Sequence, residues 1–254
     1  MSKISLKHIF TLLAFFIVHS GFSQNQFRLG LKVGISIPNL KSSGNNPVSK
    51  GWSSRQGPYT GVIAEMQIAK RFYLQAELNY SSQGGKKNGV QAIPTSSFTA
   101  YFPPNTTIPP YVYADYSSEV KLNYMELPVL LKIEFQVGHK ISLFINGGPY
   151  AGYLLAAKDV TRDSSNIYLD EKMTQALLPQ PTSFNQSTDV KSDLQKFNFG
   201  VQAGIGLSIS FHNNHKLLLT AGGNYGFTRI QKDKANGQNN TGAATVALAY
   251  LVKI

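Results

Sequence analysis

One stretch of this sequence, residues 197–211, constrains the fold more than any other. It reads FNFGVQAGIGLSISF, and every second residue is apolar while the residues between are small or polar. This alternation predicts a β-strand, because successive side chains of a strand point to opposite faces. A common globular strand has about 5–6 residues, whereas a tilted strand needs roughly 9–11 residues to cross the hydrocarbon of a bilayer. The length therefore favours a strand that spans a membrane.

Seven other segments repeat this alternation and bring the predicted number of strands to eight. They cover residues 27–37, 58–69, 71–81, 117–136, 140–157, 216–228 and 242–254. In the fourth of the eight predicted strands the phase slips near Tyr124 and Met125, which predicts a β-bulge.

The connections between these strands are long and short in turn. The long ones are residues 38–57, 82–116, 158–196 and 229–241, and the short ones are 69–71, 137–139 and 212–215. Long loops outside and short turns on the periplasmic side are typical of outer-membrane barrels. The sequence thus predicts an all-β fold, an eight-stranded antiparallel up-and-down transmembrane β-barrel. The loop 82–116 is rich in Pro and aromatic residues, and we expect it to be irregular and partly packed.

The N-terminus has the pattern of a secretory signal peptide. Lys3 and Lys7 precede an apolar stretch at 9–18, and small residues lie just before a cleavage point at Gln24. We therefore predict a signal peptide at 1–23, with the chain exported to the cell outer membrane.

The remaining residues, 24–254, are predicted to form one barrel domain. They contain no run of about 18 apolar residues, the length that a transmembrane helix needs. Charged residues make up 15% of the chain, against about 25% in soluble domains. The chain has no Cys, which excludes disulfides, thiolate metal sites and thiol nucleophiles.

Aromatic residues are predicted to form two girdles at the lipid interfaces. The periplasmic girdle consists of Phe27, Phe72, Phe135 and Phe211. The outer girdle consists of Tyr59, Tyr80, Phe197 and Phe227. The alternative is that these residues border the core of a soluble barrel.

The inward phase of the strands predicts a charged lumen. The charged residues in this phase are Arg28, Lys32, Glu65, Glu77, Glu126, Lys132, Glu134 and Lys253. Eight strands leave an interior that side chains just fill, and buried charges need partners, so we expect a plug of ion pairs. Inward glycines are expected to make room for the charged side chains: Gly200, Gly204, Gly206, Gly222 and Gly226. A path for protons or ions through the carboxylates is the alternative.

Several segments resemble a known family. They are FRLGLKVGIS at 27–36, YLQAELNYSSQGGKK at 73–87, LNYMELPVLLK at 122–132 and GPYAGYLLAAK at 148–158. Together they resemble the Bacteroidetes outer-membrane β-barrel domain family, the PorT-like or porin-family proteins, over essentially the whole exported chain. The resemblance implies an eight-stranded outer-membrane barrel without a defined activity. One class of the family acts in type IX secretion.

No catalytic or cofactor site emerges from the sequence. His139, His212 and His215 fall in predicted turns and do not supply the three or four ligands that zinc requires. The Gly-rich stretch 147–152 is not followed by a helix, which argues against phosphate binding. No Ser, His and Asp are brought together by the predicted strands. We therefore expect a protein that is not an enzyme and binds no cofactor.

The outer loops carry an excess of basic residues. The loop 38–57 contains Lys41, Lys50 and Arg55, and the loop 229–241 contains Arg229, Lys232 and Lys234 against Asp233. They are expected either to contact lipopolysaccharide phosphates or to form a solvated rim. Their dispersal argues against nucleic-acid binding.

The function predicted from the sequence is that of a monomeric barrel with a filled lumen, in contact with outer-membrane lipid. Its role is expected to be structural or interaction-based, through outer loops that touch envelope proteins or lipopolysaccharide. The alternatives are a narrow gated path for ions or small solutes and an accessory barrel of type IX secretion.

Overall fold

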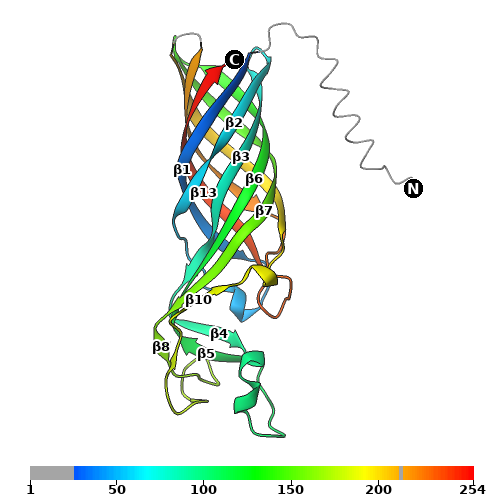
Figure 1. Cartoon of the computed structure of the whole chain (residues 1–254), viewed down its shortest axis with the longest axis vertical. Helices are drawn as coiled ribbons and strands as arrows, with labels where there is room; N and C mark the ends of the chain where they lie inside the picture. The colour runs from blue at the N-terminus through cyan, green and yellow to red at the C-terminus, as the bar shows by residue number, and fades with distance from the viewer. Residues whose placement is uncertain (1–25, 212–213) are drawn as a thin grey trace, which may run out of the picture.

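Eight long antiparallel strands form the body of the molecule (Figure 1). The computed structural model describes residues 26–211 and 214–254, so the predicted signal peptide and His212 lie outside the described residues. The strands are β1 (Phe27–Ser42), β2 (Gly57–Ala69), β3 (Phe72–Lys87), β6 (Ser117–Gln136), β7 (Ile141–Arg162), β11 (Phe197–Phe211), β12 (His215–Gly226) and β13 (Asn239–Lys253).

The sheet closes on itself. β1 pairs with both β2 and β13, and β7 pairs with both β6 and β11, so that each of the eight strands has two neighbours. Because the sheet is closed, every strand finds hydrogen-bond partners for its backbone N–H and C=O groups, which lipid cannot supply. The C-terminus lies at the end with the short turns, as an up-and-down order requires (Figure 1). The prediction of an eight-stranded antiparallel up-and-down barrel is confirmed.

Several strands match the predicted bounds or run beyond them at the outer end of the barrel, whereas β12 ends at Gly226, two residues before its predicted end. β6 and β11 have the predicted bounds, whereas β1 extends to Ser42 and β3 to Lys87. Outside the bilayer both faces of a strand can be polar, so the alternation stops while the ladder continues.

The predicted bulge in β6 is wrong, because β6 keeps one inward phase on both sides of Tyr124. The register shift opposite Asn123 and Tyr124 leaves Leu155 of β7 without a partner on β6, so the bulge lies on β7.

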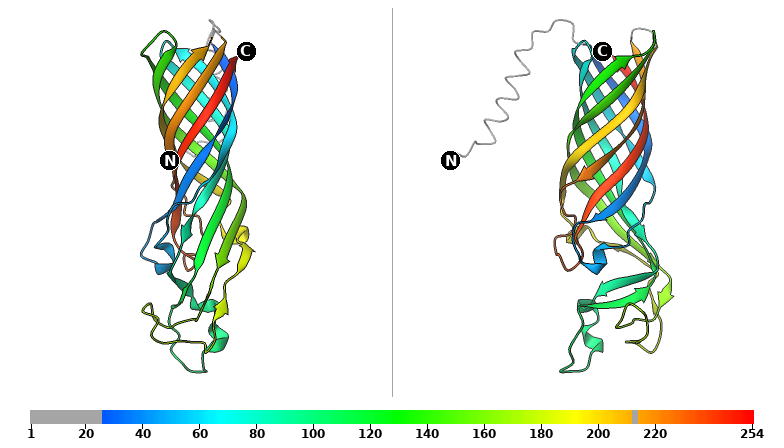
Figure 2. Two further views of the ribbon diagram at one scale, coloured as in Figure 1. Left: turned by 90° about the vertical axis from the view of Figure 1, so that its left-hand side faces the viewer. Right: turned by 180° about the vertical axis from the view of Figure 1, so that it is seen from behind.

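The long loops build a folded extension, the head, at the outer end of the barrel (Figure 2). Its strands are β4 (Val90–Pro94), β5 (Tyr111–Asp115), β8 (Ser164–Ser165), β9 (Thr182–Ser183) and β10 (Gln186–Asp189), and its 3-10 helices are η1 (Pro47–Ser49), η2 (Thr95–Ser97), η3 (Thr99–Tyr101) and η4 (Lys191–Asp193). Val112, Ala114, Ile167 and Phe184 form its buried core. The loop 82–116, expected to be irregular, thus contains the β4–β5 hairpin. Among the described residues no helix is long and apolar enough to cross a membrane.

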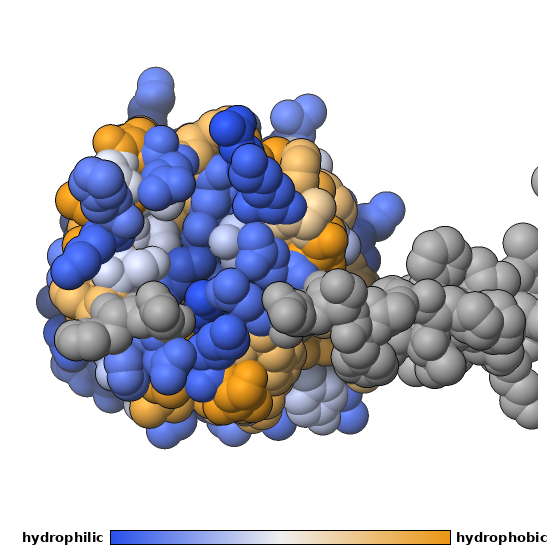
Figure 3. Space-filling view, turned by 90° about the horizontal axis from the view of Figure 1, so that it is seen from above, coloured by the Kyte–Doolittle hydropathy of each residue, from blue (hydrophilic) through white to orange (hydrophobic). Residues whose placement is uncertain are grey.

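The outer wall of the barrel is apolar and exposed. Its side chains include Leu29, Leu31, Val62, Leu78, Leu127, Leu207, Leu219 and Leu248. Seen from the end with the short turns, the centre of the barrel is hydrophilic, and hydrophobic residues lie at the perimeter among hydrophilic ones (Figure 3). This order is the reverse of a soluble protein and suits a wall that meets lipid.

Most of the predicted girdle residues face outward. The structure exposes Phe72, Phe135, Phe197, Phe211 and Phe227 and half-exposes Phe27 and Tyr80. Tyr59 is a correction, because its side chain is 2% exposed and lies in the lumen. It shares the phase of Ile63 and Glu65 on β2, and that phase points inward.

Candidate functional site

The lumen contains three groups of polar side chains. The first, the end cluster, consists of Arg28, Glu65, Lys132, Glu134 and Lys216 near the periplasmic turns. One oxygen of Glu65 lies 3.0 Å from Nζ of Lys216 and 3.9 Å from Nη1 of Arg28, and the other pairs with Lys132. Glu134 lies 2.9 Å from Lys132 and 2.8 Å from Lys216. Two carboxylates therefore share two lysines in one continuous network.

Aromatic rings complete the surroundings of these lysines. The Nζ atoms of Lys132 and Lys216 lie 4.8 and 4.5 Å from the ring centroid of Tyr73. Phe144 offers its ring to Lys132 at 5.1 Å. Cations over ring faces gain electrostatic attraction where water is excluded. The end cluster is thus held by ion pairs and by rings, and it leaves little room between them.

The second group surrounds Glu77 in the middle of the barrel. Lys32 pairs with this carboxylate and also donates to the hydroxyl of Tyr59 at 3.2 Å. The amide of Asn79 donates to Glu77 at 2.7 Å and to Tyr59 at 3.0 Å, and Gln75 donates to the second carboxylate oxygen. Tyr59 therefore belongs to the polar filling of the lumen and not to a girdle.

The third group surrounds Glu126, which is fully buried. It accepts hydrogen bonds from the amides of Gln83 at 3.2 Å and Asn224 at 3.3 Å. Among the described residues no cation lies within ion-pair distance of it. The expectation that every lumen carboxylate has a cationic partner is therefore wrong for Glu126, because amide donors serve this carboxylate instead.

Two lysines exchange roles relative to the prediction. Lys253 has the inward phase, but it lies at the last position of β13 and is exposed, so it does not join the lumen cluster. Lys216 lies in the lumen cluster instead, although it is not among the predicted lumen charges. It lies next to the turn at 212–215, and the inward phase of Leu218 and Thr220, continued by one step, would have found it.

The inward glycines make room for different groups than expected. An added Cβ at Gly206 would lie 2.4 Å from the ring of Phe144, and one at Gly200 would lie 2.6 Å from the ring of Tyr150. Nearest to the others are the side chains of Asn198 and Thr241 at Gly226 and Asn146 at Gly204, and the backbone of Ala203 at Gly222. The space beside the inward glycines is therefore occupied by aromatic rings, by polar side chains and by the backbone of neighbouring strands. The expectation that long charged side chains occupy it is wrong.

An apolar cluster closes the outer mouth of the lumen. This mouth core consists of Leu40, Leu122, Tyr124, Leu154, Ala157, Leu194 and Ile230. Within the lumen, a cavity beside Lys32 and Glu77 has a volume of about 20 Å³, room for a single water. The polar groups, the cluster of Ile63, Phe144, Leu218, Ala249 and Leu251, and the mouth core occupy the barrel interior.

The basic residues of the outer loops divide into two kinds. Arg55 is buried and pairs with Glu119 at 3.0 Å. Arg229 and Lys232 donate to backbone carbonyls. Lys41, Lys50 and Lys234 are exposed. Half of the residues predicted to form a basic rim are thus engaged within the loops.

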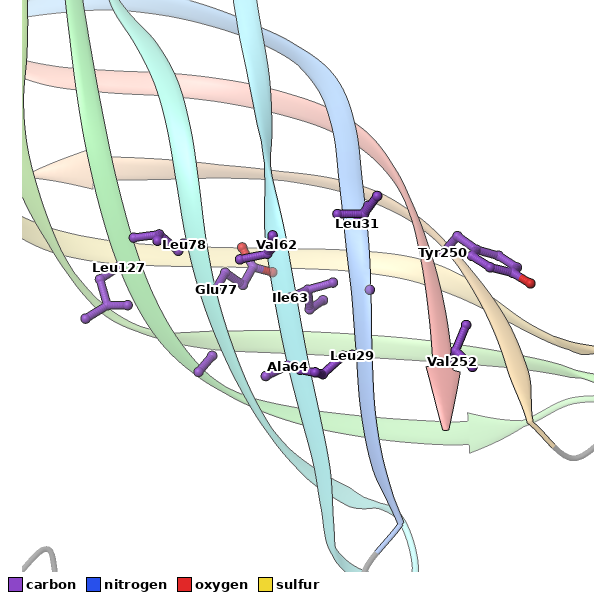
Figure 4. A pocket seen from close by; sticks show the side chains of 12 residues that line it. Leu29, Leu31, Val62, Ile63, Ala64, Glu77, Leu78, Leu127, Tyr250 and Val252 are labelled. Atoms are coloured by element: carbon purple, nitrogen blue, oxygen red, sulfur yellow. The ribbon is translucent and has the colours of Figure 1, made fainter. Parts of the chain in front are cut away.

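A shallow hollow lies on the outer wall (Figure 4). It measures about 720 Å³ and takes its lining from β1, β2, β3, β6 and β13, with Leu31, Val62 and Leu78 among the side chains. It opens on the wall that meets lipid, which makes it a seat for acyl chains and not for a soluble ligand.

A closed antiparallel ring, an apolar outer wall and a lumen of packed, largely polar side chains define a transmembrane β-barrel. Residues 22–232 match the family model described as outer membrane protein beta-barrel domain. The chain belongs to this family, and the family implies the outer membrane. No curated protein matches the chain.

Three of the solved structures to which the chain is similar are NspA, Ail and OprG. Neisserial surface protein A (NspA) is 14% identical, with 90% of this chain and 97% of that chain covered and a TM-score of 0.39. Ail of Yersinia pestis, in complex with the heparin analogue sucrose octasulfate, is 10% identical over 90% of this chain and 99% of that chain, with a TM-score of 0.36. OprG from Pseudomonas aeruginosa is 7% identical over 90% and 93%, with a TM-score of 0.36. At these identities the role of a neighbour says nothing about the role of this chain.

Proposed function

We propose that this protein is a closed barrel that anchors its head in the outer membrane and acts through contacts of the head. The filled lumen carries the proposal, since its central cavity has room for about one water. Eight-stranded barrels have an interior that side chains can occupy completely. Neither catalysis nor a cofactor is part of this role, and the barrel is proposed to act as a monomer.

Conductance in planar bilayers tests the closed lumen. The purified protein is expected to give no stable channels, while the double variant Glu65→Ala and Glu134→Ala, which removes both carboxylates of the end cluster, is expected to give leak currents. Large stable channels in the unmodified protein would contradict the proposal. Glu119→Ala, in an ion pair outside the lumen, is the matched control and should stay silent.

A narrow ion path is the second candidate, and one observation favours it. Among the described residues no cation lies within ion-pair distance of the buried Glu126, so a cation that passes along the lumen would meet an unpaired carboxylate there. Small cation-selective currents that disappear in Glu126→Gln, but persist in Glu119→Gln, would support the path over the closed barrel.

We also propose that lysines above the lipid-facing wall contact phosphates of lipopolysaccharide. Lys121 and Lys158 are direct partners across β6 and β7. Lys121 also lies 3.5 Å from Glu119, whereas Lys158 has no ion-pair partner among the described residues, and Lys86 is exposed on the neighbouring strand. Like charges that face each other destabilise a sheet, and a phosphate between them would offset this repulsion. Loss of bound lipopolysaccharide from the double variant Lys121→Gln and Lys158→Gln, but not from Lys172→Gln in the head, is the expected result.

A place among PorT-like barrels of the Bacteroidetes is a finer proposal. The segments 122–132 and 148–158 support it by their resemblance to that family. In this proposal residues 1–23 act as a signal peptide, and the head contacts envelope proteins that include a type IX secretion machine. Affinity capture from solubilised envelopes tests it, and recovery of the barrel without any secretion component would contradict the secretion role.

A further inference from the structure

A cavity between the barrel mouth and the head has the features of a ligand site. This mouth cavity measures about 420 Å³, within the range of roughly 300–1,000 Å³ that small-molecule sites occupy. All four long loops line it, and they contribute Trp52, Lys87, Asp159, Leu194 and Ile230 among others. It lies above the mouth core, so it is separate from the lumen.

Lys87 brings a buried positive charge to this cavity. Its side chain is 6% exposed, and its Nζ donates to the carbonyl of Val48 at 2.9 Å. Within the part of the chain that the structure describes, no carboxylate lies within 4 Å of that nitrogen. Trp52 offers its ring at 5.2 Å and has a buried indole N–H without a described acceptor. Two donors in one wall are thus left short of acceptors, which is costly unless a ligand supplies them.

Asp159 brings a negative charge to the same cavity. Its carboxylate accepts from the hydroxyl of Ser118 at 2.8 Å, and no cation lies within 4 Å among the described residues. Burial raises the pKa of this carboxyl above its usual range. Asp193, which also lines the cavity, is exposed, so water screens its charge.

The rest of the lining is apolar. Leu40, Leu194 and Ile230 belong to the mouth core, and Val120 and Val190 pack against it. A hydrocarbon body bound there would lose contact with water. The cavity therefore offers a cation, an anion and an apolar wall together.

We propose that the mouth cavity binds a small zwitterion with an apolar body, of the class of short apolar peptides. The carboxylate of the ligand meets Lys87 and the N–H of Trp52, the ammonium group meets Asp159, and the side chains lie against the wall of the mouth core. The site goes beyond the envelope contacts proposed above, and it does not depend on the conductance of the barrel.

Trp52 is the single Trp of the chain, so its fluorescence reports on the cavity directly. We would titrate the full-length exported protein in detergent micelles with leucyl-leucine, N-acetyl-leucyl-leucine and leucyl-leucinamide. A saturable change with leucyl-leucine is expected, with affinity roughly tenfold lower for each blocked form, about 1.4 kcal/mol. No saturable change with any probe, or equal affinity for all three, would overturn the proposal.

Variants assign the two charged ends. Lys87→Met is expected to bind leucyl-leucine and its amide equally, whereas Lys87→Arg keeps the preference for the free carboxylate. Asp159→Asn is expected to bind leucyl-leucine and its acetyl form equally. The matched controls are Lys86→Met and Asp115→Asn, both at exposed positions nearby, and they should behave as the unmodified protein. Equal losses in Lys86→Met and Lys87→Met would mean that the effect is general charge and would contradict the site.

Discussion

The barrel and the head of this protein differ in which side chains they bury and expose. Besides an apolar cluster of Ile63, Phe144, Leu218, Ala249 and Leu251, the barrel buries charged side chains, and it exposes apolar ones. In the barrel, Glu65 and Lys132 are fully buried while Leu31 and Ile205 are exposed. In the head, Val112 and Ala114 form the buried core and the exposed side chains are mostly polar. The difference follows from the solvent, because lipid accepts apolar side chains on the outside of a barrel and water does not. In the membrane-spanning part the exposed side chains are apolar, and in the head they are mostly polar. The change occurs at the outer end of the lipid-facing wall.

The largest expected effect comes from breaking the end cluster. Glu65→Leu leaves Lys132 and Lys216 buried with half of their carboxylate partners and is expected to lower the free energy of unfolding by about 3–5 kcal/mol. Equilibrium unfolding in urea from lipid vesicles measures it. Lys121→Met, which removes the exposed partner of Glu119 outside the lumen, should cost no more than about 1 kcal/mol. Equal losses in the two variants would contradict the larger cost expected for a buried ion pair in the lumen.

A similar or slightly smaller effect is expected in the head, where the buried groups are apolar. Phe184 packs in the head core and stacks on Tyr116 with ring centroids 4.3 Å apart. Phe184→Ala is expected to destabilise the head by about 3 kcal/mol without changing the unfolding of the barrel. Limited proteolysis of the protein in vesicles should cut within the loops 82–116 and 158–196 while the barrel stays intact. Unfolding of both parts together would show that they are one cooperative unit.

A charged side chain on the outer wall of the barrel is expected to destabilise the protein, although the lumen contains several charged side chains. Ile205 is exposed near the middle of β11, and Ile205→Arg is expected to cost about 2–4 kcal/mol if it lies at the midplane of the bilayer. Unfolding from vesicles measures this cost, and Ile108→Arg, at an exposed position in the head, is the control with little expected change. A neutral Ile205→Arg would mean that this face does not meet hydrocarbon.

The smallest expected effect is a change in the fluorescence of Trp52, which lies between the barrel and the head. Burial lowers the pKa of Lys87 from 10.5 to about 8, so its amine is charged below that pH and neutral above it. The cavity around it contains Asp159, Asp193 and Tyr116, and Lys50 and Glu171 line the neighbouring groove. Because Lys87 lies over the ring of Trp52, the emission of Trp52 should shift with a midpoint near pH 8. Lys87→Met should abolish the shift, and Lys86→Met should keep it.

The sign of the linkage follows from the direction of this shift. The folded state binds the proton of Lys87 more weakly than the unfolded chain, in which the pKa is about 10.4. The free energy of unfolding is therefore expected to rise as the pH increases from about 8 towards 10.4.

The barrel could be predicted from the sequence because the alternation of apolar and polar residues within each strand is a local pattern. Alternation at each strand separates the lipid side from the lumen side, and seven of the eight predicted lumen charges face the lumen in the structure. Tyr59 was misplaced because its position near the rim outweighed the phase that it shares with Glu65. Lys216 was missed because the phase was not followed into the turn.

The head could not be predicted in the same way. Its core joins Val112 to Ile167 and Phe184, residues from different loops whose spacing follows no period. The mouth cavity depends on the same long-range contacts, since Lys87 and Asp159 come from different strands. Only the structure brings these residues together.

Access of water to the lumen tests the central claim most directly. The chain has no native Cys, and Ser36, Ser81 and Ser208 are buried in the lumen phase, so each can be replaced by Cys with little change of shape. In the folded protein these three variants are expected to resist a small water-soluble thiol reagent, while Ser192→Cys in the head, at an exposed position, reacts at once. Rapid reaction at Ser36→Cys, Ser81→Cys or Ser208→Cys in the native barrel would contradict a filled lumen.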